Sequence, residues 1–169
     1  NAVPPGTAGE VAVRGPNVMA GYWNKPEQTA EVLLDGGWYR SGDIGYLDDD
    51  GYLFLVDRAK DMIVSGGENV YCTEVEDALY AHPGVLEATV FGVPDEQWGE
   101  AVQAAVVLRA GVQVDEAELT AHCRERIAGY KVPKGFEFRS EALPKSGAGK
   151  VLKRVLREPY WSGKERSIN

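Results

Sequence analysis

The chain has 169 residues, of which 44% are hydrophobic and 26% charged, the proportions of an ordinary soluble globular protein. Its formal net charge of −8 argues against a general affinity for nucleic acid, because no basic field covers the whole chain. No apolar run approaches the roughly 18 residues that a membrane span requires, so we expect no membrane-spanning segment.

Cysteine and histidine usage excludes two further classes of site. Cys72 and Cys123 are far apart, and His82 and His122 do not combine with them at a zinc-binding spacing, so we predict no metal site. Two cysteines with no disulfide framework indicate a reducing, cytoplasmic location. The chain begins at Asn1 with no visible signal peptide, and we expect it to be a piece of a longer protein.

The first 59 residues have the pattern of the β-rich end of a larger N-terminal domain. Pro26 suits the first turn of a short helix over residues 26–34. Residues 48–51 indicate a hairpin turn, in which Gly51 provides the positive φ. Strands are expected over residues 10–14, 38–41, 44–47 and 52–56. A few strands and one short helix make too small a core to stand alone.

Residues 57–61 separate this segment from a second apolar run that begins at Met62. Four of these five side chains are charged, and unpaired charges are costly to bury. We therefore predict a joint between two bodies, with its charges facing a shared cleft.

Residues 60–169 have the pattern of a small α+β domain that is large enough to fold alone. The expected order is hairpin, helix, strand, strand, helix, strand, helix, which makes a three-stranded sheet and a hairpin with helices. The turn of the hairpin is Gly66-Gly67. The three strands are expected over residues 85–93, 101–108 and 136–139.

The helices of this domain are predicted from caps and apolar spacing. Thr73 is expected to cap the first helix, with Glu76 completing a capping box. Asp115 is expected to cap the second helix, which Gly129 closes. The third is a short basic helix over residues 151–157. Its inward-facing residues are expected to be Leu152, Val155 and Leu156.

The loop over residues 145–150 invites comparison with phosphate-binding loops. A Walker loop is excluded because Pro144 and Val151 occupy positions that need glycine and a hydroxyl residue. A dinucleotide fingerprint is excluded because Leu152 replaces its third glycine. What remains is a flexible, glycine-rich arm that presents Lys150, either as a solvated side chain or as a catalytic one.

Other polar residues also have two interpretations. Asp43 is either a turn former or a bidentate acceptor for a ribose diol. Arg58 either pairs with Asp57 or Asp61 or neutralises a nucleotide. A local basic cluster is either a solvated face or a contact for a phosphate-bearing ligand. Its members are Lys145, Lys150, Lys153, Arg154, Arg157, Lys164 and Arg166.

Four segments together resemble core motifs of the adenylate-forming superfamily, which comprises acyl- and aryl-CoA synthetases, peptide-synthetase adenylation domains and beetle luciferases. They are WYRSGDIG at 38–45, DRAKDMIVSGGEN at 57–69, YKVP at 130–133 and LPKSGAGKVLKR at 143–154. The motifs occur in the family's order and spacing, and the resemblance covers nearly all of residues 9–157. It looks closest to bacterial fatty-acyl-CoA ligases.

The resemblance implies the C-terminal part of an ATP-dependent, AMP-forming acyl-CoA ligase. Such an enzyme converts a carboxylic acid, here expected to be a fatty acid, to its CoA thioester through an acyl-adenylate. Residues 60–169 would be its mobile C-terminal domain, with its own N-terminal domain as partner. The alternatives are an adenylation domain that loads a carrier protein and a non-catalytic lid or interaction module.

The resemblance also implies roles for single residues. Asp43 would hold the ribose hydroxyls of ATP, Arg58 would contact the ribose and phosphate side, and Leu55 would lie near the nucleoside. Lys150 would bridge the carboxylate substrate and the α-phosphate, and Lys60 would be the hinge. The residues that would flank the CoA tunnel after rotation are Ser65, Gly66, Gly67, Tyr130 and Lys131.

Several parts of the family pattern are expected upstream of this chain. They are the phosphate-binding loop, the adenine motif, the acyl pocket and the glutamate that binds the Mg²⁺ accompanying ATP. We therefore expect no adenylate formation by this chain alone. Within the Lys150 loop, Ser146 keeps one of the family's hydroxyl groups, whereas Ala148 lacks the other.

Overall fold

The computed structural model describes residues 2–162, so Lys164 and Arg166 of the predicted basic cluster lie outside the described residues. The chain forms two compact units, Asn1–Lys60 and Asp61–Asn169, which we call the first and second units. Both combine strands and helices, which confirms the predicted α+β class. In the described part of the chain, no helix has the length and apolar content needed to cross a membrane.

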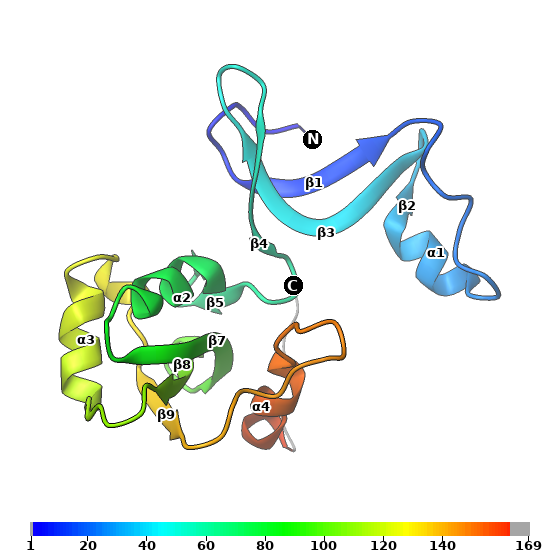
Figure 1. The fold of residues 1–169 in the computed structure, drawn as a ribbon. Helices are drawn as coiled ribbons and strands as arrows, with labels where there is room; N and C mark the ends of the chain where they lie inside the picture. Colours follow the sequence, from blue (N-terminus) through cyan, green and yellow to red (C-terminus); the bar gives the residue numbers. More distant parts are fainter. Residues whose placement is uncertain (1, 163–169) are drawn as a thin grey trace. The chain divides into compact units, whose positions relative to one another are not determined.

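From residue 2 to residue 60, the first unit is a four-stranded antiparallel sheet with one short helix (Figure 1). Strand β3 is central: it pairs with β1 along one edge and with β2 and β4 along the other. The elements are β1 (Gly9–Arg14), α1 (Pro26–Val32), β2 (Leu33–Leu34), β3 (Trp38–Leu47) and β4 (Leu53–Arg58).

The prediction of two strands on either side of Gly42-Asp43 is wrong, because β3 is continuous through them. Gly42 adopts a φ of 76°, which bends the strand without ending it. Its carbonyl oxygen accepts a hydrogen bond from the amide of Ala59 at 2.9 Å. The pairing with β1 also shifts register across this point, between Glu10 opposite Ile44 and Ala12 opposite Arg40. The glycine therefore marks a bulge within one strand, a common role for glycine in sheets.

The first unit buries little apolar surface within itself. Among its described residues, Ile44 is the one hydrophobic side chain that is fully buried. The exposed apolar side chains on β3 and β4 are Trp38, Leu47, Leu53, Phe54 and Leu55. A small buried core with exposed apolar side chains is what we expect of one end of a larger domain. The rest of that domain stays a prediction.

Over its described residues, 61–162, the second unit is a five-stranded mixed sheet with three α-helices. Strand β8 pairs antiparallel with β7 and β5 and parallel with β9. The strands are β5 (Ile63–Ser65), β6 (Glu68–Val70), β7 (Val85–Asp95), β8 (Gly99–Leu108) and β9 (Gly135–Arg139). The helices are α2 (Cys72–Tyr80), α3 (Glu116–Arg124) and α4 (Lys153–Trp161), with a 3₁₀ turn, η1, at Gly129–Lys131. The expected separate hairpin is part of this sheet, since Ser65 pairs with Gly99.

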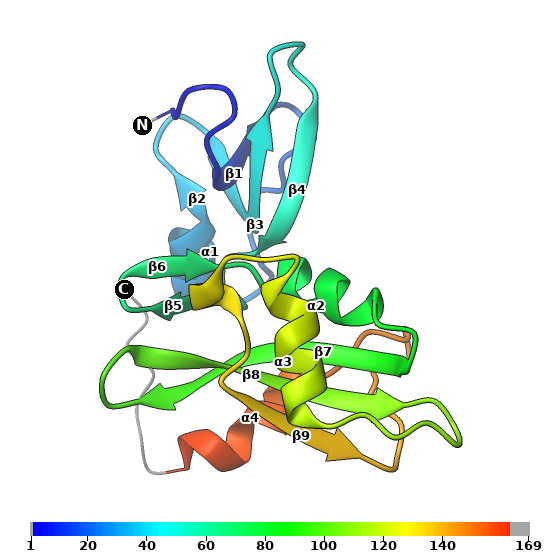
Figure 2. The same ribbon diagram turned by 90° about the vertical axis from the view of Figure 1, so that its left-hand side faces the viewer.

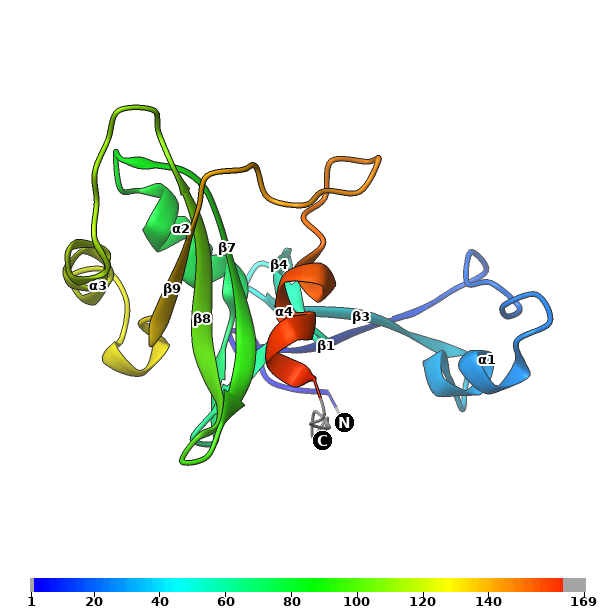
Figure 3. The ribbon, with the colours of Figure 1, turned by 90° about the horizontal axis from the view of Figure 1, so that it is seen from below.

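Helices cover both faces of this sheet. Figure 2 shows α2 and α3 in front of β7 and β8, and Figure 3 shows α4 on the opposite face. Successive residues of β8 point to opposite faces, so Ala104 and Val106 join the core under α2 and α3. Ala105 and Val107 join a smaller core on the side of α4. Burial on both faces explains why β8 is almost wholly apolar.

The helix caps were predicted correctly only where the contact is local. Asp115 caps α3, as predicted, with Oδ1 accepting the amide hydrogen of Glu118 at 2.8 Å. The predicted capping box of α2 is wrong, because Tyr71 is its N-cap and makes no side-chain cap bond. The carboxylate of Glu76 faces β7 instead, where it accepts from Thr89 and Val90.

The predicted ends of the other two helices also need correction. Helix α3 ends at Arg124, and Gly129 begins η1 rather than closing α3. Helix α4 starts at Lys153 and continues to Trp161. Of its predicted inward residues only Leu156 is buried, since Leu152 is 39% and Val155 45% exposed. The apolar stripe of α4 is therefore narrower than predicted.

Candidate functional site

Asp43 and Arg58 lie opposite each other in the first unit, on β3 and β4. Arg58 Nε is 3.5 Å from Asp43 Oδ1, and the two side chains are 55% and 35% exposed. The Arg58 side chain thus faces Asp43, whereas the Arg58 amide donates to Asp57 Oδ1 at 2.7 Å. Exposed pairs of this kind contribute little to stability. A diol can therefore compete for the carboxylate, and a phosphate for the guanidinium.

Leu55 lies on the same strand pair, opposite Gly45, and is 63% exposed. An exposed apolar side chain can contact the flat face of a nucleoside. The structure thus brings three predicted nucleotide residues onto β3 and β4. Their roles stay predictions.

Lys60 is the last residue of the first unit. Just before it, the amide of Ala59 donates to the carbonyl of Gly42 at 2.9 Å. Just after it, the thiol of Cys72 donates to the carbonyl of Asp61 at 3.0 Å. Each flank is therefore fastened to its own unit, and the backbone angles at Lys60 lie between the two attachments.

Ser65, Gly66 and Gly67 form the end of the β5–β6 hairpin in the second unit. Gly66 and Gly67 have φ values of 61° and 85°, as a type I′ turn requires. The amide of Gly66 donates to the carbonyl of Trp98 at 2.9 Å. A Cβ on Gly66 would lie 2.6 Å from Cε3 of the Trp98 ring. Trp98 was missed by the sequence analysis, where the available signal was an aromatic residue in a polar loop.

We expect Gly66→Ala to destabilise the second unit by about 1–3 kcal/mol, because it adds steric overlap to an unfavourable φ. Gly67→Ala is the matched control, since it has the same kind of φ and no atom within 4 Å of the added Cβ. Urea unfolding of the three proteins measures the difference. Equal losses in both variants would show that the Trp98 contact is unimportant.

Tyr130 and Lys131 lie in η1, and Lys131 is engaged by a carboxylate. Its Nζ lies 2.7 and 2.6 Å from the two carboxylate oxygens of Glu74 and 5.6 Å from the centre of the Tyr130 ring. Burial is the largest single effect and lowers the pKa of Lys131, but the hydrogen bond and charge of Glu74, together with Tyr130, outweigh it, so the pKa is raised. Lys131 is therefore a fixed cation. Glu74, its partner, was not singled out from the sequence.

Lys150 is presented by a closed hairpin rather than by the predicted flexible arm. The amide of Ser146 donates to the carbonyl of Lys150, and the amide of Leu152 to that of Pro144, each at 2.8 Å. The hydroxyl of Ser146 accepts the amide hydrogen of Lys150 at 3.3 Å. Gly149 adopts a φ of 78°. The backbone is thus ordered by its own hydrogen bonds, while the Lys150 side chain is exposed.

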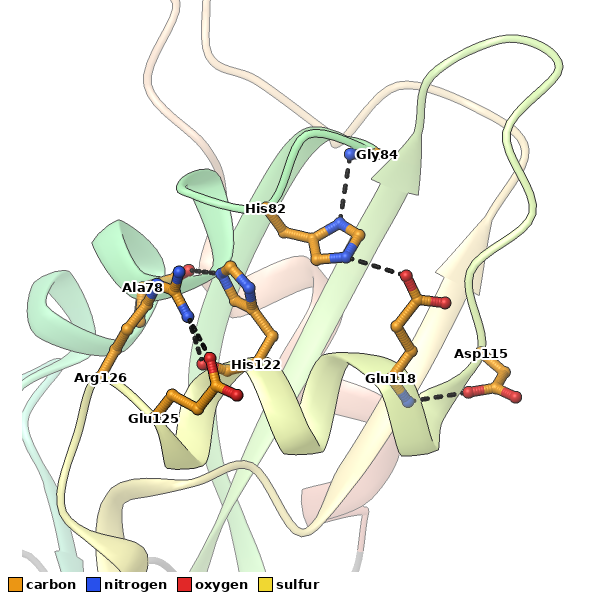
Figure 4. Close-up of polar contacts among 8 residues, drawn as sticks. All are labelled: Ala78, His82, Gly84, Asp115, Glu118, His122, Glu125 and Arg126. Carbon is orange, nitrogen blue, oxygen red and sulfur yellow. Dashed lines mark hydrogen bonds and ion pairs between the residues drawn. The ribbon is translucent and has the colours of Figure 1, made fainter.

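A groove of about 520 Å³ lies elsewhere on the second unit and involves no predicted site residue. It is lined by Leu108, Val112, Gln113, Val114, Asp115, Glu118 and Phe138. Glu118, one of the lining residues, lies 3.2 Å from His82 Nε2, while His82 Nδ1 accepts from the amide of Gly84 at 3.1 Å (Figure 4). The His82 and His122 rings meet edge to face at 4.8 Å. In the described residues, no cluster of three or more metal-binding side chains occurs.

We expect the second unit to lose stability on mild acidification because of His122. Its Nε2 donates to the carbonyl of Ala78 at 2.9 Å. Burial, and then the charges of Arg126 and His82, lower the pKa of His122 below 6.5, although Ala78 and Glu125 act in the opposite direction. The folded unit therefore binds fewer protons than the unfolded chain. The contribution is present above pH 6.5 and is lost as the pH falls through the folded pKa.

Unfolding in urea at about pH 7.5 and about pH 5.5 measures this effect. The transition midpoint should be lower at the acidic pH. His122→Gln keeps a donor for the Ala78 carbonyl and should reduce the dependence on pH. The same dependence in both proteins would assign the effect to other groups.

The predicted site residues are thus divided between the two units. Asp43, Leu55, Arg58 and Lys60 are in the first, and the others are in the second. Comparison with known proteins shows which family each unit resembles. Residues 74–150 match the family model described as the AMP-binding enzyme C-terminal domain.

Known proteins are similar to almost the whole chain. It is 56% identical over 158 residues to feruloyl-CoA synthase of an Amycolatopsis species, covering 94% of this chain and 32% of that protein. It is 55% identical over 150 residues to the long-chain-fatty-acid–CoA ligase of Bacillus subtilis, covering 89% of this chain and 26% of the ligase. The ATP-bound crystal structure of MatB from Rhodopseudomonas palustris superposes with a TM-score of 0.88 and 40% identity, covering 96% of this chain and 32% of MatB.

This chain therefore spans about a third of the length of the proteins that it matches. The similarity extends over both units, and the family model falls within the second. The chain belongs to the adenylate-forming superfamily, and its second unit carries the AMP-binding enzyme C-terminal domain.

Proposed function

We propose that the chain is the C-terminal portion of an ATP-dependent, AMP-forming acyl-CoA ligase and supplies the lysine for its first half-reaction. The observation that carries the proposal is the exposed Lys150 side chain on a hairpin closed by its own hydrogen bonds. This hairpin belongs to the domain that matches the AMP-binding family.

The chemistry needs such a cation. In the first half-reaction a carboxylate oxygen attacks the α-phosphorus of ATP, forming the acyl-adenylate and releasing pyrophosphate. Two anions approach each other in this step, so an ammonium group placed between them stabilises the transition state. Lys150 has that role in the proposal, while Asp43 holds the ribose hydroxyls beside Arg58 and Leu55.

In the second half-reaction the thiol of CoA attacks the acyl carbonyl and AMP leaves. The proposed tunnel residues are Ser65, Gly66, Gly67, Tyr130 and Lys131. Among these, the Lys131 ammonium is held in place by both carboxylate oxygens of Glu74. The Mg²⁺ that accompanies ATP would be bound by residues outside this chain.

The proposal also covers the class of carboxylic acid substrate and the cellular compartment. The Bacillus subtilis relative is named for long-chain fatty acids and the Amycolatopsis relative for ferulate, at almost equal identity. Similarity in this portion therefore does not distinguish between the two acids, and we propose a fatty acid as the first class to test. Cys72 and Cys123 are buried thiols that do not form a disulfide, which supports the proposed cytoplasmic location.

The test joins this chain to the N-terminal portion of the Bacillus subtilis relative, giving what we call the joined enzyme. We expect it to catalyse pyrophosphate exchange that depends on a fatty acid, whereas this chain alone should not. The complete Bacillus ligase is the positive control. An inactive joined enzyme, with an active control, would contradict the proposed function. Transfer to a carrier protein but not to CoA would favour the alternative acceptor.

The proposed hinge at Lys60 has its own prediction. Lys60→Pro fixes one backbone angle between the two attached flanks, so we expect it to spare adenylate formation. Thioester formation from supplied acyl-adenylate should slow, because one pocket serves both steps only if the second unit turns. Rapid-quench assays of the two half-reactions measure this. Normal rates in both would remove Lys60 as the hinge.

A further inference from the structure

The hairpin that carries Lys150 is fastened to strand β7 on its N-terminal side by Glu87. One carboxylate oxygen accepts the amide hydrogen of Leu143 at 2.9 Å, and the other accepts from Lys145 Nζ at 2.5 Å. The Lys145 hydrogen bond, followed by the Leu143 amide, lowers the pKa of Glu87. Glu87 is 20% exposed and Leu143 is buried. The chain entering the hairpin is therefore held at two successive points.

The C-terminal side of the hairpin is fastened by Glu76 of helix α2. Its Oε1 lies 2.9 Å from Nζ of Lys153, the first residue of α4, and both side chains are mostly buried. The same oxygen accepts from the Thr89 hydroxyl at 2.9 Å and from the Val90 amide at 2.8 Å. The backbone of β7 thus orients Glu76 toward Lys153.

Glu87 is part of β7 and Glu76 binds to it, and among the described residues β7 is an edge strand whose one paired neighbour is β8. The outward amide of Val90 has Glu76 in place of a neighbouring strand. Between the two attachments, Lys145 pairs with Val151 as an isolated bridge that closes the hairpin. Figure 3 shows this loop, between β9 and α4, extending away from the sheet.

We propose that Glu87 and Glu76 are positioning residues that clamp the Lys150 hairpin from both sides. The inference rests on the proposed function of Lys150. A lysine that stabilises a transition state must be held near its productive position, since a displacement of about 1 Å can cost about 10²-fold in rate. The hairpin's own hydrogen bonds fix its shape, and the two carboxylates fix its place on the sheet.

The first test measures the clamp without any enzymatic assay. Amide hydrogen exchange is followed in this chain at Leu143, whose amide donates to Glu87, and at Leu152, whose amide closes the hairpin beside Lys153. In Glu87→Gln and Glu76→Gln we expect exchange to rise about tenfold, the effect of losing one hydrogen bond to a charged group. Glu118→Gln is the matched control, since it neutralises a carboxylate paired with His82 in the same unit. Unaltered exchange in both clamp variants would overturn the proposal.

The second test measures positioning in the joined enzyme. Glu87→Gln should lower kcat for adenylate formation by about 10–100-fold, whereas thioester formation from supplied acyl-adenylate should be unchanged. Lys145→Gln should reproduce the loss, and the double variant should lose no more than either single one. A parallel fall in both half-reactions would show a general structural role instead. If the unsubstituted joined enzyme is inactive, the proposed function fails, and hydrogen exchange still decides whether the carboxylates hold the hairpin.

Discussion

Lys150→Ala is expected to lower adenylate formation in the joined enzyme by about 10²–10³-fold, the usual cost of removing one donor to a developing anion. The substitution deletes the exposed ammonium and leaves the hairpin intact, because the closing hydrogen bonds use backbone atoms and Ser146. Thioester formation from supplied acyl-adenylate should continue, since the thiol step follows the departure of the lysine. Pyrophosphate exchange and single-turnover thioester formation measure the two steps separately.

The control for this substitution is Arg124→Ala. Arg124 is an exposed cation on α3 of the same unit and is not among the proposed site residues. It should leave both steps unchanged, which separates loss of the Lys150 charge from loss of charge in general. Equal losses of the two steps in Lys150→Ala would contradict the division of roles between the half-reactions.

The fold was predictable from the sequence where the deciding interactions are local. Asp115 caps α3 through an amide three residues away, so the sequence spacing contains the whole interaction. Glu76 has the same spacing from Thr73, yet its carboxylate contacts Thr89, Val90 and Lys153. A capping pattern indicates that a local hydrogen bond is possible. It does not indicate whether a distant strand edge offers the same carboxylate a more favourable hydrogen bond.

The candidate site was predictable to a similar degree. Lys150 was identified because a glycine-rich loop and a family motif coincide there. Its proposed anchor, Glu87, has no local signature, since a glutamate in a strand looks like any other polar residue. Trp98 is comparable: its contact with Gly66 depends on the pairing of β5 with β8. Residues that position a site through tertiary contacts are thus the ones that local patterns miss.

Phe91→Ala is expected to destabilise the second unit by about 3–5 kcal/mol, the usual cost of removing a buried phenyl ring. Phe91 is 1% exposed and belongs to the smaller core on the α4 face of the sheet. This core also contains Leu143, just before the Lys150 hairpin, and Leu156 of α4. The Tyr160 ring lies 5.8 Å from that of Phe91 and is too exposed to fill the cavity.

Urea unfolding of the second unit measures the loss, with Phe138→Ala as the matched control. Phe138 is a half-exposed phenylalanine on β9, so its truncation should cost far less. Because the larger core under α2 and α3 does not include Phe91, the loss should act first on the α4 face. Amides of α4 should then exchange faster than those of α2. Equal costs for the two phenylalanines would show that the smaller core does not hold α4 and the hairpin to the sheet.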